Sequence, residues 1–411
     1  MKFNYEKLGN LIEISEKKNS DLTVENLVGM NINKEFMPSV ANTIGTNLAR
    51  YKVIHKDQFA CNLMHVGRDK SVVVSKYPLE KPSIISPAYK IFQVKDTSII
   101  LPDFLMLYFL KSEFDRLGWF YTDSSIRGSL DWSKFCNIEI PVPDIDVQKK
   151  IVDVCQFFNE LIALKERINN NLDTIESTLF NEWFINRSFF AEEPKKETEL
   201  GLIPDSWNVI NLGGVGLDIS DGNYSSKYPK STEFVKEGVP FIRGKDFSNK
   251  TIDLRNAVFI TPEKHSELKK GHTKKGDLIM TSRGEIGQIA YLPDNLIDVN
   301  INSQLIRLNG NGVLPRSYLA GFLFSNFVKN IIKGLTSGTA LQQLTISKLS
   351  LIPFLLPPNE ILEKYDKIVS PIREMILKNQ DEIWRLQHLK DTLLPKLLSG
   401  EIDIFVINCV L

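Results

Sequence analysis

Apolar residues recur at alternating steps of three and four along residues 146–184, which predicts a long amphipathic helix. Lys165 interrupts the repeat once, and the spacing is that of a coiled-coil seam. A surface helix packed on a globular core shows a similar pattern, so this segment alone leaves both interpretations open. The predicted seam consists of Ile151, Val154, Phe158, Leu161, Lys165, Ile168, Leu172, Ile175 and Leu179.

A second copy of the pattern lies 214 residues further on, between residues 360 and 398, and favours the coiled coil. Leu172 matches Leu386 without a gap, and the match extends upstream, where Tyr108 matches Phe322 and Pro143 matches Pro357. The chain therefore contains a duplicated unit. The second predicted seam consists of Ile368, Ile372, Met375, Asn379, Leu386, Leu389 and Leu393.

Short strand-like segments bounded by turn residues, followed by one apolar helical run, precede each long helix. Prolines close both regions, in IEIPVPD and LIPFLLPP, and disfavour helix for the residues before them. The predicted fold class is α+β, with two similar globular domains alternating with two long helices that pack as an antiparallel coiled coil about a pseudo-two-fold axis. In order, the predicted parts are a domain at 1–143, a helix at 144–188, a linker at 189–206, a domain at 207–357, a helix at 358–402 and a tail at 403–411.

Composition agrees with two ordinary folded domains. The 411 residues exceed what one hydrophobic core usually supports, and 43% of them are apolar against 24% charged. No apolar run reaches the roughly 18 residues that span a bilayer, and MKFNYEKLG lacks a signal-peptide core, so we expect no membrane partner and a cytoplasmic location. Fifty basic residues cancel fifty acidic ones, so nucleic acid must be bound through local patches.

Cysteine and histidine spacing argues against disulfides and structural zinc. Cys61, Cys136, Cys155 and Cys409 are scattered, and no histidine stands at metal-ligand spacing. We therefore expect no metal site.

Catalytic motifs are also missing. PEKHSELK superficially resembles a metal-dependent nuclease pattern, but Glu263 and Glu267 are four residues apart and should share one solvated helix face. GVPFIRGK has one residue too many for a phosphate-binding loop and continues with Asp246 rather than Ser or Thr. There is no Asn-Pro-Pro-aromatic motif for adenine methylation and no Gly-rich cofactor turn, so no catalytic residue is assigned.

Several segments, in their order along the duplicated chain, resemble the specificity subunits of type I restriction-modification enzymes. They are GVPFIRGKDF (238–247), KKGDLIMTSRGEIGQIA (274–290), VNINSQLIRL (299–308) and LLPKLLSGEI (393–402). FACNLMHVGRDKSVVVSKY and IISPAYKIFQV in the first half are similar to another version of the same domain. The first half departs where residues 55–58, His-Lys-Asp-Gln, occupy the place of residues 274–277, Lys-Lys-Gly-Asp.

The resemblance implies a non-catalytic, DNA-recognising chain. Each domain would be a target recognition domain that reads one half of a bipartite double-stranded DNA sequence, and the helices would be a rigid spacer. A helix of about 40 residues is about 60 Å long at about 1.5 Å per residue. The implied partners are methylation subunits, usually two, which bind S-adenosylmethionine, and restriction subunits, which use ATP and Mg²⁺. This chain itself would hold no cofactor.

Basic and amide side chains near glycines are the candidates for DNA contact. Such positions let an arginine approach base edges or phosphates, although an ordinary solvated turn charge gives the same pattern. A polar loop before a helix is the alternative for the two glutamines. The candidates are Arg243, Lys245 and Arg283 in the second domain, Arg68, Lys70 and Arg127 as their counterparts in the first, and Gln342 and Gln343.

Two alternative functions and two local predictions remain. The chain could instead be a stand-alone nucleic-acid enzyme, or a coiled-coil scaffold that binds no DNA. Lys165 and its repeat partner Asn379 should meet near the axis of an antiparallel pair, unless both point outward; Glu382 also falls on the seam. The apolar tail IDIFVINCVL either adds a strand to a domain or is a ragged end, and we favour the strand.

Overall fold

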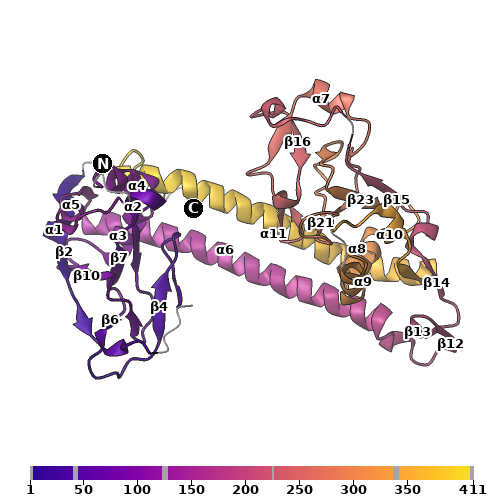
Figure 1. Cartoon of the computed structure of the whole chain (residues 1–411), viewed down its shortest axis with the longest axis horizontal. Coiled ribbons are helices and arrows are strands. Elements are labelled where there is room, and N and C mark those ends of the chain that lie inside the picture. Colours follow the sequence, from indigo (N-terminus) through magenta and orange to yellow (C-terminus); the bar gives the residue numbers. More distant parts are fainter. Residues whose placement is uncertain (1–2, 40–44, 123–127, 225, 337–341, 408–411) are drawn as a thin grey trace. The chain divides into compact units, whose positions relative to one another are not determined.

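The computed structural model describes residues 3–39, 45–122, 128–224, 226–336 and 342–407. The chain divides into two compact units (Figure 1). Unit 1 combines Met1–Ala163 with Trp384–Leu411, and unit 2 is Leu164–Ile383. Each unit therefore includes one end of both long helices, whereas the predicted domains contained none of either.

Unit 1 is built around a four-stranded antiparallel sheet in the order β2-β10-β7-β8. Alternate side chains point to opposite faces, as a strand requires. Phe59 and Phe92 stack with ring centroids 5.1 Å apart on the face that forms the main core, and Phe109 meets both edge-on. Ala60 and Ile91 belong to a second, smaller core. The strands are β2 (Ile12–Ile14), β10 (Lys90–Val94), β7 (Phe59–Asn62) and β8 (Val73–Lys76).

The smaller core of unit 1 packs against a five-stranded sheet in the order β3-β6-β9-β4-β5, in which β4 and β9 are parallel. Its strands are β3 (Lys17–Lys18), β6 (Lys52–Ile54), β9 (Ser83–Ile85), β4 (Leu27–Met30) and β5 (Phe36–Pro38). β1 (Asn4–Lys7) pairs with β11 (Glu139–Val142). The short helices are α1 (Leu8–Leu11), η1 (Leu48–Arg50), α2 (Val66–Asp69), α3 (Pro102–Phe109), α4 (Ser112–Phe120) and α5 (Trp132–Cys136).

Unit 2 contains a six-stranded sheet in the order β15-β23-β20-β21-β18-β17 and a three-stranded sheet in the order β19-β16-β22. The first comprises β15 (Asp218–Asp221), β23 (Leu305–Asn309), β20 (Leu278–Thr281), β21 (Ile289–Tyr291), β18 (Thr251–Ile252) and β17 (Phe247–Ser248). The second comprises β19 (Val258–Ile260), β16 (Val239–Ile242) and β22 (Asn300–Ile301). β14 (Asn208–Asn211) pairs with β24 (Pro353–Leu356). The helices are η4 (Leu212–Gly214), η5 (Ser231–Glu233), η6 (Gly244–Asp246), α7 (Pro262–Glu267), α8 (Arg316–Phe324), α9 (Asn326–Thr336) and α10 (Ile346–Ser350).

The two units share one strand arrangement. The antiparallel run β2-β10-β7-β8 of unit 1 corresponds to β15-β23-β20-β21 of unit 2, and the parallel pair β4-β9 corresponds to β16-β22. The pair β1-β11 likewise corresponds to β14-β24. The duplication read from the sequence is therefore present in the strand order of both units.

The segment where the first half departs from the second nevertheless forms the same turn. The Gln58 side chain accepts a hydrogen bond from the His55 amide at 2.9 Å, as the Asp277 side chain does from the Lys274 amide at 2.7 Å. Asp57 has φ +64° where Gly276 has φ +85°. Aspartate tolerates the left-handed conformation better than most residues, which explains why the turn survives without glycine.

The long helices are α6 (Ile145–Phe180), continued by a π-helical turn η2 (Asn181–Ile185), and α11 (Asn359–Ser399). Within unit 2 they run antiparallel: Asn379 donates to Asn169 at 2.9 Å, and Arg373 donates to Asp173 at 2.7 Å. Within unit 1 Lys390 donates to Asn159 at 3.0 Å. Rising numbers on α6 thus meet falling numbers on α11, as predicted.

The predicted seam is confirmed at one heptad position and only in part at the other. On α6, Ile151 and Phe158 are buried and Lys165, Leu172 and Leu179 are half-buried, as expected. At the second position Val154 and Leu161 are half-buried too, but Ile168 and Ile175 are exposed, and the more buried residues are the next ones along, Cys155, Ile162, Asn169 and Glu176. On α11 the residues Val369, Ile376 and Lys390 replace Ile368, Met375 and Leu389, whereas Ile372, Asn379, Leu386 and Leu393 are half-buried.

The polar side chains at the true seam explain the error. Ile168 and Ile175 are 37% and 47% exposed, while the neighbouring Asn169 and Glu176 are 7% and 4% exposed. Glu176 accepts hydrogen bonds from Arg373 and from the Tyr291 hydroxyl, which satisfies its buried carboxylate. Apolar periodicity assigns the seam to the isoleucines because it contains no information about polar partners from other parts of the chain.

Lys165 and Asn379 do not meet. Lys165 forms an ion pair with Glu382, and Asn379 bonds to Asn169. The polar register contact predicted for this part of the seam therefore exists between residues next to the expected ones.

The predicted linker at 189–206 is folded. It contains a hairpin, β12 (Lys195–Thr198) and β13 (Gly201–Pro204), after the turn η3 (Ser188–Phe190). Phe190 and Ile203 are buried in the main core of unit 2 with Trp207. Charge and proline content suggested a linker, but these two apolar anchors tie the segment to the unit.

The described part of the tail forms a short helix rather than the predicted strand. α12 (Ile404–Ile407) ends the described residues, and Ile404 is fully buried in the core of unit 1 beside Leu397 and Leu398. Within the described ranges no helix combines the length and the apolar character that crossing a membrane requires.

Candidate nucleic-acid interface

One edge of the main sheet in unit 2 gathers several loops. The end of β15 leads to Gly222, the end of β16 to Arg243, and the end of β20 to Arg283. Asn302, before β23, donates its amide to the Ile242 carbonyl at 2.9 Å. A Cβ on Gly222 would lie 2.0 Å from the Asn302 carbonyl oxygen, so only glycine permits this close approach.

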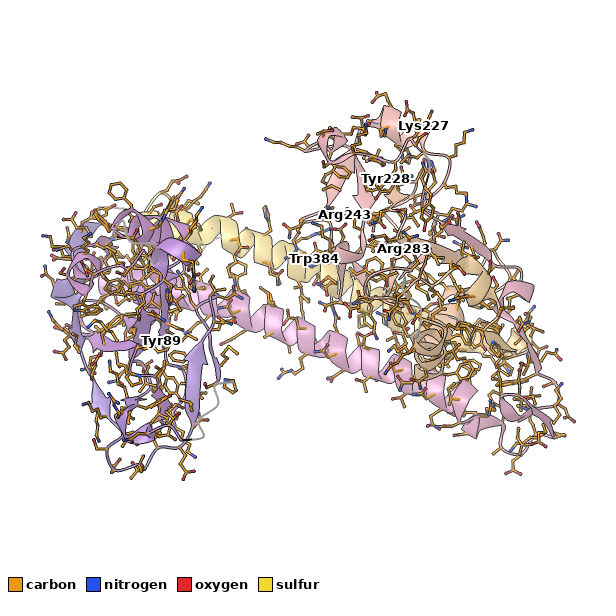
Figure 2. The ribbon with its side chains drawn as sticks, in the orientation of Figure 1. Tyr89, Lys227, Tyr228, Arg243, Arg283 and Trp384 are labelled. Carbon is orange, nitrogen blue, oxygen red and sulfur yellow. The ribbon has the colours of Figure 1, made fainter. Side chains whose placement is uncertain are left out.

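Arg283, labelled in Figure 2, is exposed on this edge. The structure brings one of the predicted glutamines to it. Its guanidinium donates to the Gln343 side chain at 2.8 Å and lies 5.7 Å from the centre of the Tyr224 ring. The loops are joined because the Leu344 amide donates to the Ser282 carbonyl at 3.0 Å. A guanidinium held by an amide and an exposed ring can contact phosphate or stack on a base.

Gln342 lines a depression of about 310 Å³ beside the Arg283 loop. Two exposed lysines one helical turn apart on α9, Lys329 and Lys333, line it together with Gly284 and Gly287. This depression is therefore a basic surface next to Arg283. The sequence analysis predicted neither these two lysines nor Tyr224. The lysines were marked in the sequence only by their place on the polar face of an amphipathic helix, and Tyr224 only by its place in a loop after Gly222.

The side chain of Arg243 is bound within the protein, whereas that of Lys245 is exposed to solvent. The guanidinium of Arg243 donates to the buried Asp246 carboxylate at 3.0 and 3.1 Å and to the Asn256 carbonyl at 3.1 Å. That pairing favours a structural role over base contact. Lys245 is exposed on the turn that Arg243 closes, and a Cβ on Gly244 would lie 3.2 Å from Thr281, so Lys245 is next to the Arg283 loop.

Unit 1 has the same loop arrangement at the equivalent edge. The Leu130 amide donates to the Leu63 carbonyl at 2.9 Å, as Leu344 does to Ser282 in unit 2. Gly67 and Gly128 touch, because a Cβ on Gly67 would lie 2.6 Å from the Cα of Gly128. Arg68 is next to this contact and is exposed.

The candidates of unit 1 therefore correspond differently from the prediction. Arg68 follows β7, whose counterpart β20 precedes Arg283, so Arg68 lies in the loop that corresponds to the Arg283 loop rather than to the Arg243 loop. Arg68 pairs with Asp69 at 2.7 Å, and Lys70, with φ +51°, lies over the Trp119 ring at 5.2 Å. Arg127 is outside the described residues.

A polar depression of about 320 Å³ surrounds Arg68. Asn31, Asn62, His65 and Tyr89 line it, and Tyr89 is labelled in Figure 2. The Nδ1 atom of His65 is buried and has no hydrogen-bond partner. Asn62 ends β7 and Tyr89 precedes β10 in the four-stranded sheet, whereas Asn31 follows β4 of the five-stranded sheet. None of these residues was predicted, because neither their type nor their spacing marks them in the sequence.

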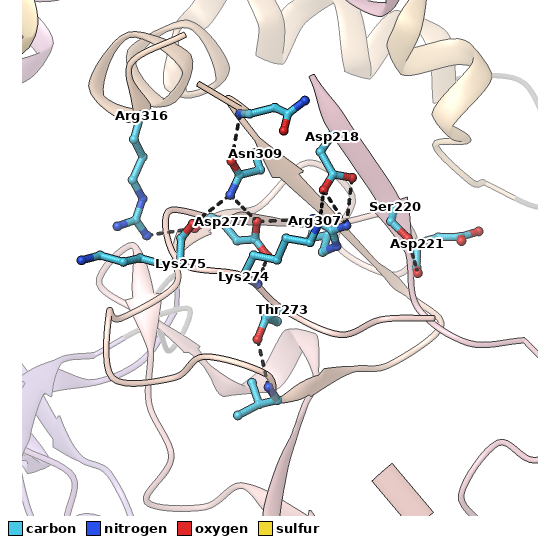
Figure 3. A network of polar contacts seen from close by, with 12 residues as sticks. Asp218, Ser220, Asp221, Thr273, Lys274, Lys275, Asp277, Arg307, Asn309 and Arg316 are labelled. Carbon is cyan, nitrogen blue, oxygen red and sulfur yellow. Dashed lines mark hydrogen bonds and ion pairs between the residues drawn. The ribbon is translucent and has the colours of Figure 1, made fainter. Parts of the chain in front are cut away.

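A buried ion network supports the opposite end of β20 (Figure 3). Arg307 pairs with Asp218 at 2.9 Å and with Asp277 at 3.5 Å. Burial raises the pKa of Asp277, opposed by hydrogen bonds from the Lys274 amide and Asn309. Although burial opposes the shift, Lys274 and Arg307 lower the pKa of Asp218. Both carboxylates are thus matched by cations and hold the strands together.

The structure agrees with the rejection of a nuclease site at PEKHSELK. Glu263 and Glu267 are both exposed on α7, which is the solvated face predicted for them. His265 and His272, whose sequence spacing suggested no metal site, converge with Asp298, and one ligand atom from each residue lies within 4.8 Å of the others.

Comparisons with known proteins agree with this architecture. The profile of the type I restriction modification DNA specificity domain family matches residues 5–174 and 204–386, and the chain belongs to this family. Each match falls mainly in one of the two units. With two such domains, the chain is a specificity subunit of a type I restriction-modification system.

The relatives carry matching names. The type I restriction enzyme MjaIX specificity subunit of Methanocaldococcus jannaschii is 29% identical over 280 residues, which are 67% of this chain and 63% of the relative. The HindI specificity subunit of Haemophilus influenzae is 24% identical over 388 residues, covering 78% of this chain and 81% of the relative. The alignment thus spans less than two thirds of the MjaIX subunit.

A solved structure shares the fold. The crystal structure of the type I restriction-modification system S subunit from M. genitalium superposes with a TM-score of 0.59 at 16% identity, covering 96% of both chains.

Proposed function

We propose that each unit reads one half of a bipartite double-stranded DNA target through the loops at its sheet edge. The observation that carries this proposal is the matched pair of loop contacts, Leu130 to Leu63 and Leu344 to Ser282, which place Arg68 and Arg283 in corresponding loops. The loop frameworks are alike, but the side chains on them differ. Two unlike sets of side chains on one framework are what two unlike half-sites require.

The helices then act as the spacer. We propose that α6 and α11 form an antiparallel coiled coil related by a pseudo-two-fold axis, and that its length sets the number of bases between the half-sites. Support comes from the 214-residue repeat and from the antiparallel hydrogen bonds at Asn169 and Asp173. The polar pair Asn169–Asn379 would fix the register, as buried polar residues do in coiled coils.

Catalysis belongs to partner subunits in this proposal. Methylation subunits, usually two, would dock on the outer helix faces and adjacent unit surfaces and supply S-adenosylmethionine. Restriction subunits would supply ATP and Mg²⁺ chemistry. This chain would contribute only sequence recognition, in the cytoplasm.

The test uses the full chain, duplex DNA and the methylation subunit. We expect methylation of a bipartite sequence only when both proteins are present, and salt-dependent DNA binding by the complex. Methylation by the isolated chain would favour a stand-alone enzyme, and a complex that binds no DNA would favour a scaffold.

A further inference from the structure

Two of the five histidines in the chain lie side by side near the smaller sheet of unit 2. His265 is on α7, and His272 is in the loop that follows, with ring centroids 4.4 Å apart. Both face one carboxylate oxygen of Asp298: His272 Nδ1 at 2.8 Å and His265 Nε2 at 3.4 Å. Two imidazole nitrogens and one carboxylate oxygen thus converge on one point.

The outer nitrogens of the rings fix which atoms carry hydrogen. His272 Nε2 faces the Leu268 carbonyl oxygen at 2.5 Å, and because a carbonyl only accepts, this nitrogen must be N–H. His265 Nδ1 contacts the Oδ1 atom of Asn300, a fully buried side chain whose amide nitrogen donates to the Lys270 carbonyl at 3.5 Å. His265 Nδ1 is therefore N–H as well.

The inner nitrogens conflict with Asp298 whichever of the rings is protonated. Wherever a ring is neutral, its inner nitrogen points a lone pair at the carboxylate, which is repulsive. If both rings are protonated instead, two cations stand 4.4 Å apart and share one acid. A divalent cation between the three atoms removes both conflicts.

The surroundings suit a metal. Metal-bound histidines usually donate their other N–H to a carbonyl or a carboxylate, as these two donate to Leu268 and Asn300. The nearby cations are engaged elsewhere: Lys264 pairs with Glu233 at 2.7 Å and Lys270 with Asp221 at 3.2 Å.

We propose that His265, His272 and Asp298 bind one divalent transition-metal ion of the zinc class. Two imidazoles and a carboxylate are a ligand set typical of zinc, with a fourth position left for water or an outside ligand. The side chain of Asp298 is 66% exposed, so that position is reached from solvent.

Such an ion would stabilise the segments that support the loops of Tyr224 and Arg283, which we propose contact DNA. It would tie α7 to the loop of residues 268–275 and to the turn at Asp298. Gly271 in that loop packs against Gly222, since a Cβ on Gly271 would lie 3.2 Å from the Gly222 Cα. Gly222 starts the loop that carries Tyr224 to Arg283. The metal site itself does not depend on the proposed DNA function.

The test uses tag-free, chelator-treated full-length protein, with Co²⁺ as the spectroscopic probe and Zn²⁺ as the competitor. We expect one Co²⁺ per chain with visible d–d absorption, a dissociation constant below about 10 µM and displacement by Zn²⁺. Zn²⁺ at about 100 times its dissociation constant should raise the melting temperature by about 5 °C. His265→Gln and His272→Gln should abolish the spectrum, while His388→Gln, an exposed histidine on α11, should keep it.

The Asp298→Asn variant distinguishes loss of a metal ligand from loss of folding. It removes the charge, keeps the size and should weaken Co²⁺ binding at least about tenfold with an unchanged far-ultraviolet circular dichroism spectrum. If the histidine variants unfold, this variant alone decides. Absence of stoichiometric binding, or binding that survives the histidine variants or is unaltered in Asp298→Asn, would overturn the proposal. None of these readouts involves DNA, so they fail or succeed separately from the proposed recognition function.

Discussion

The two units use one strand order around different polar interiors. At matched positions, unit 1 places Gln58, which donates to Ser15 at 2.8 Å and to Gln93 at 3.3 Å. Unit 2 places Asp277 at the position of Gln58 and Asn309 at that of Gln93, and adds Arg307, whose counterpart is Ile91, to form a network of buried ions. The turn before β7 or β20 is the same in both. The backbone framework is thus maintained by hydrogen-bond geometry, while the charge of the interior is free to change.

The largest difference between the units should appear when a polar residue of each sheet is made apolar. Arg307→Leu leaves the fully buried Asp277 without its cation and Asp218 with Lys274 alone, and should cost about 3–5 kcal/mol of unfolding free energy. Gln93→Leu removes partly solvated hydrogen bonds to Gln58 and Glu13 and should cost about 1 kcal/mol. Hydrogen exchange of peptides from β20 and β7 in denaturant measures both. Equal costs would contradict the contrast between charged and neutral interiors.

The next effect concerns the loops, where the units should act independently. Arg283→Ala should weaken recognition of one half-site by about 1–3 kcal/mol if the arginine contacts a base, and Arg68→Ala should act on the other half-site. Lys195→Ala, on the β12-β13 hairpin of unit 2, is the matched control and should leave both unchanged. Methylation rates on targets altered in one half at a time give the readout. Uniform weakening on all sequences would identify phosphate contacts instead, and unchanged rates would remove these arginines from the interface.

The seam offers a smaller effect with a distinct signature. Replacing both Asn169 and Asn379 by Leu removes a buried polar pair and should raise the melting temperature by about 3 °C, or about 1 kcal/mol. Slipped registers should then become accessible, so the complex should accept altered spacings between half-sites. Asn170→Leu, exposed on the same helix, is the control. A lower melting temperature with an unchanged spacing preference would show that the pair does not set the register.

The smallest expected effect is on the rate at which the Cys61 thiol of unit 1 reacts with a labelling reagent. Burial raises the pKa of Cys61 to about 12, so at pH 8 it has roughly a thousandfold less thiolate than an exposed cysteine. In a Cys409→Ser background the described cysteines all belong to unit 1. Cys61 should react with a thiol reagent only as unit 1 opens, and Arg307→Leu should not accelerate it. Rapid labelling in native buffer would contradict the packing of the sheet.

Sequence periodicity and order were enough for the architecture but not for the details of pairing. Ile168 and Ile175 satisfied the apolar repeat, yet Asn169 and Glu176 occupy the seam because partners on α11 and β21 satisfy them. Such partners come from distant parts of the chain. The segment expected to be a linker likewise packs against the core of unit 2, because Phe190 and Ile203, two apolar residues among many charged ones, are buried there.

The candidate site shows the same limit. Arg283, Gln342 and Gln343 were identified from glycines and loops, and the fold brings them together. Arg243 carried the same local signal but is bound by Asp246 three residues away. His265 and His272 were passed over because their third partner, Asp298, comes from a later turn. Side-chain type marks candidates, whereas tertiary contacts decide which of them are free.

The central claim, that each unit reads its own half-site, is tested most directly by methylome mapping of cells that express a chimera. Residues 189–357, which include the β12-β13 hairpin, would be replaced by the equivalent segment of another specificity subunit, keeping both long helices. We predict that one half of the methylated sequence changes, while the other half and the spacing stay as in the wild type. Loss or change of both halves in a folded, methylation-competent chimera would contradict two independent readers.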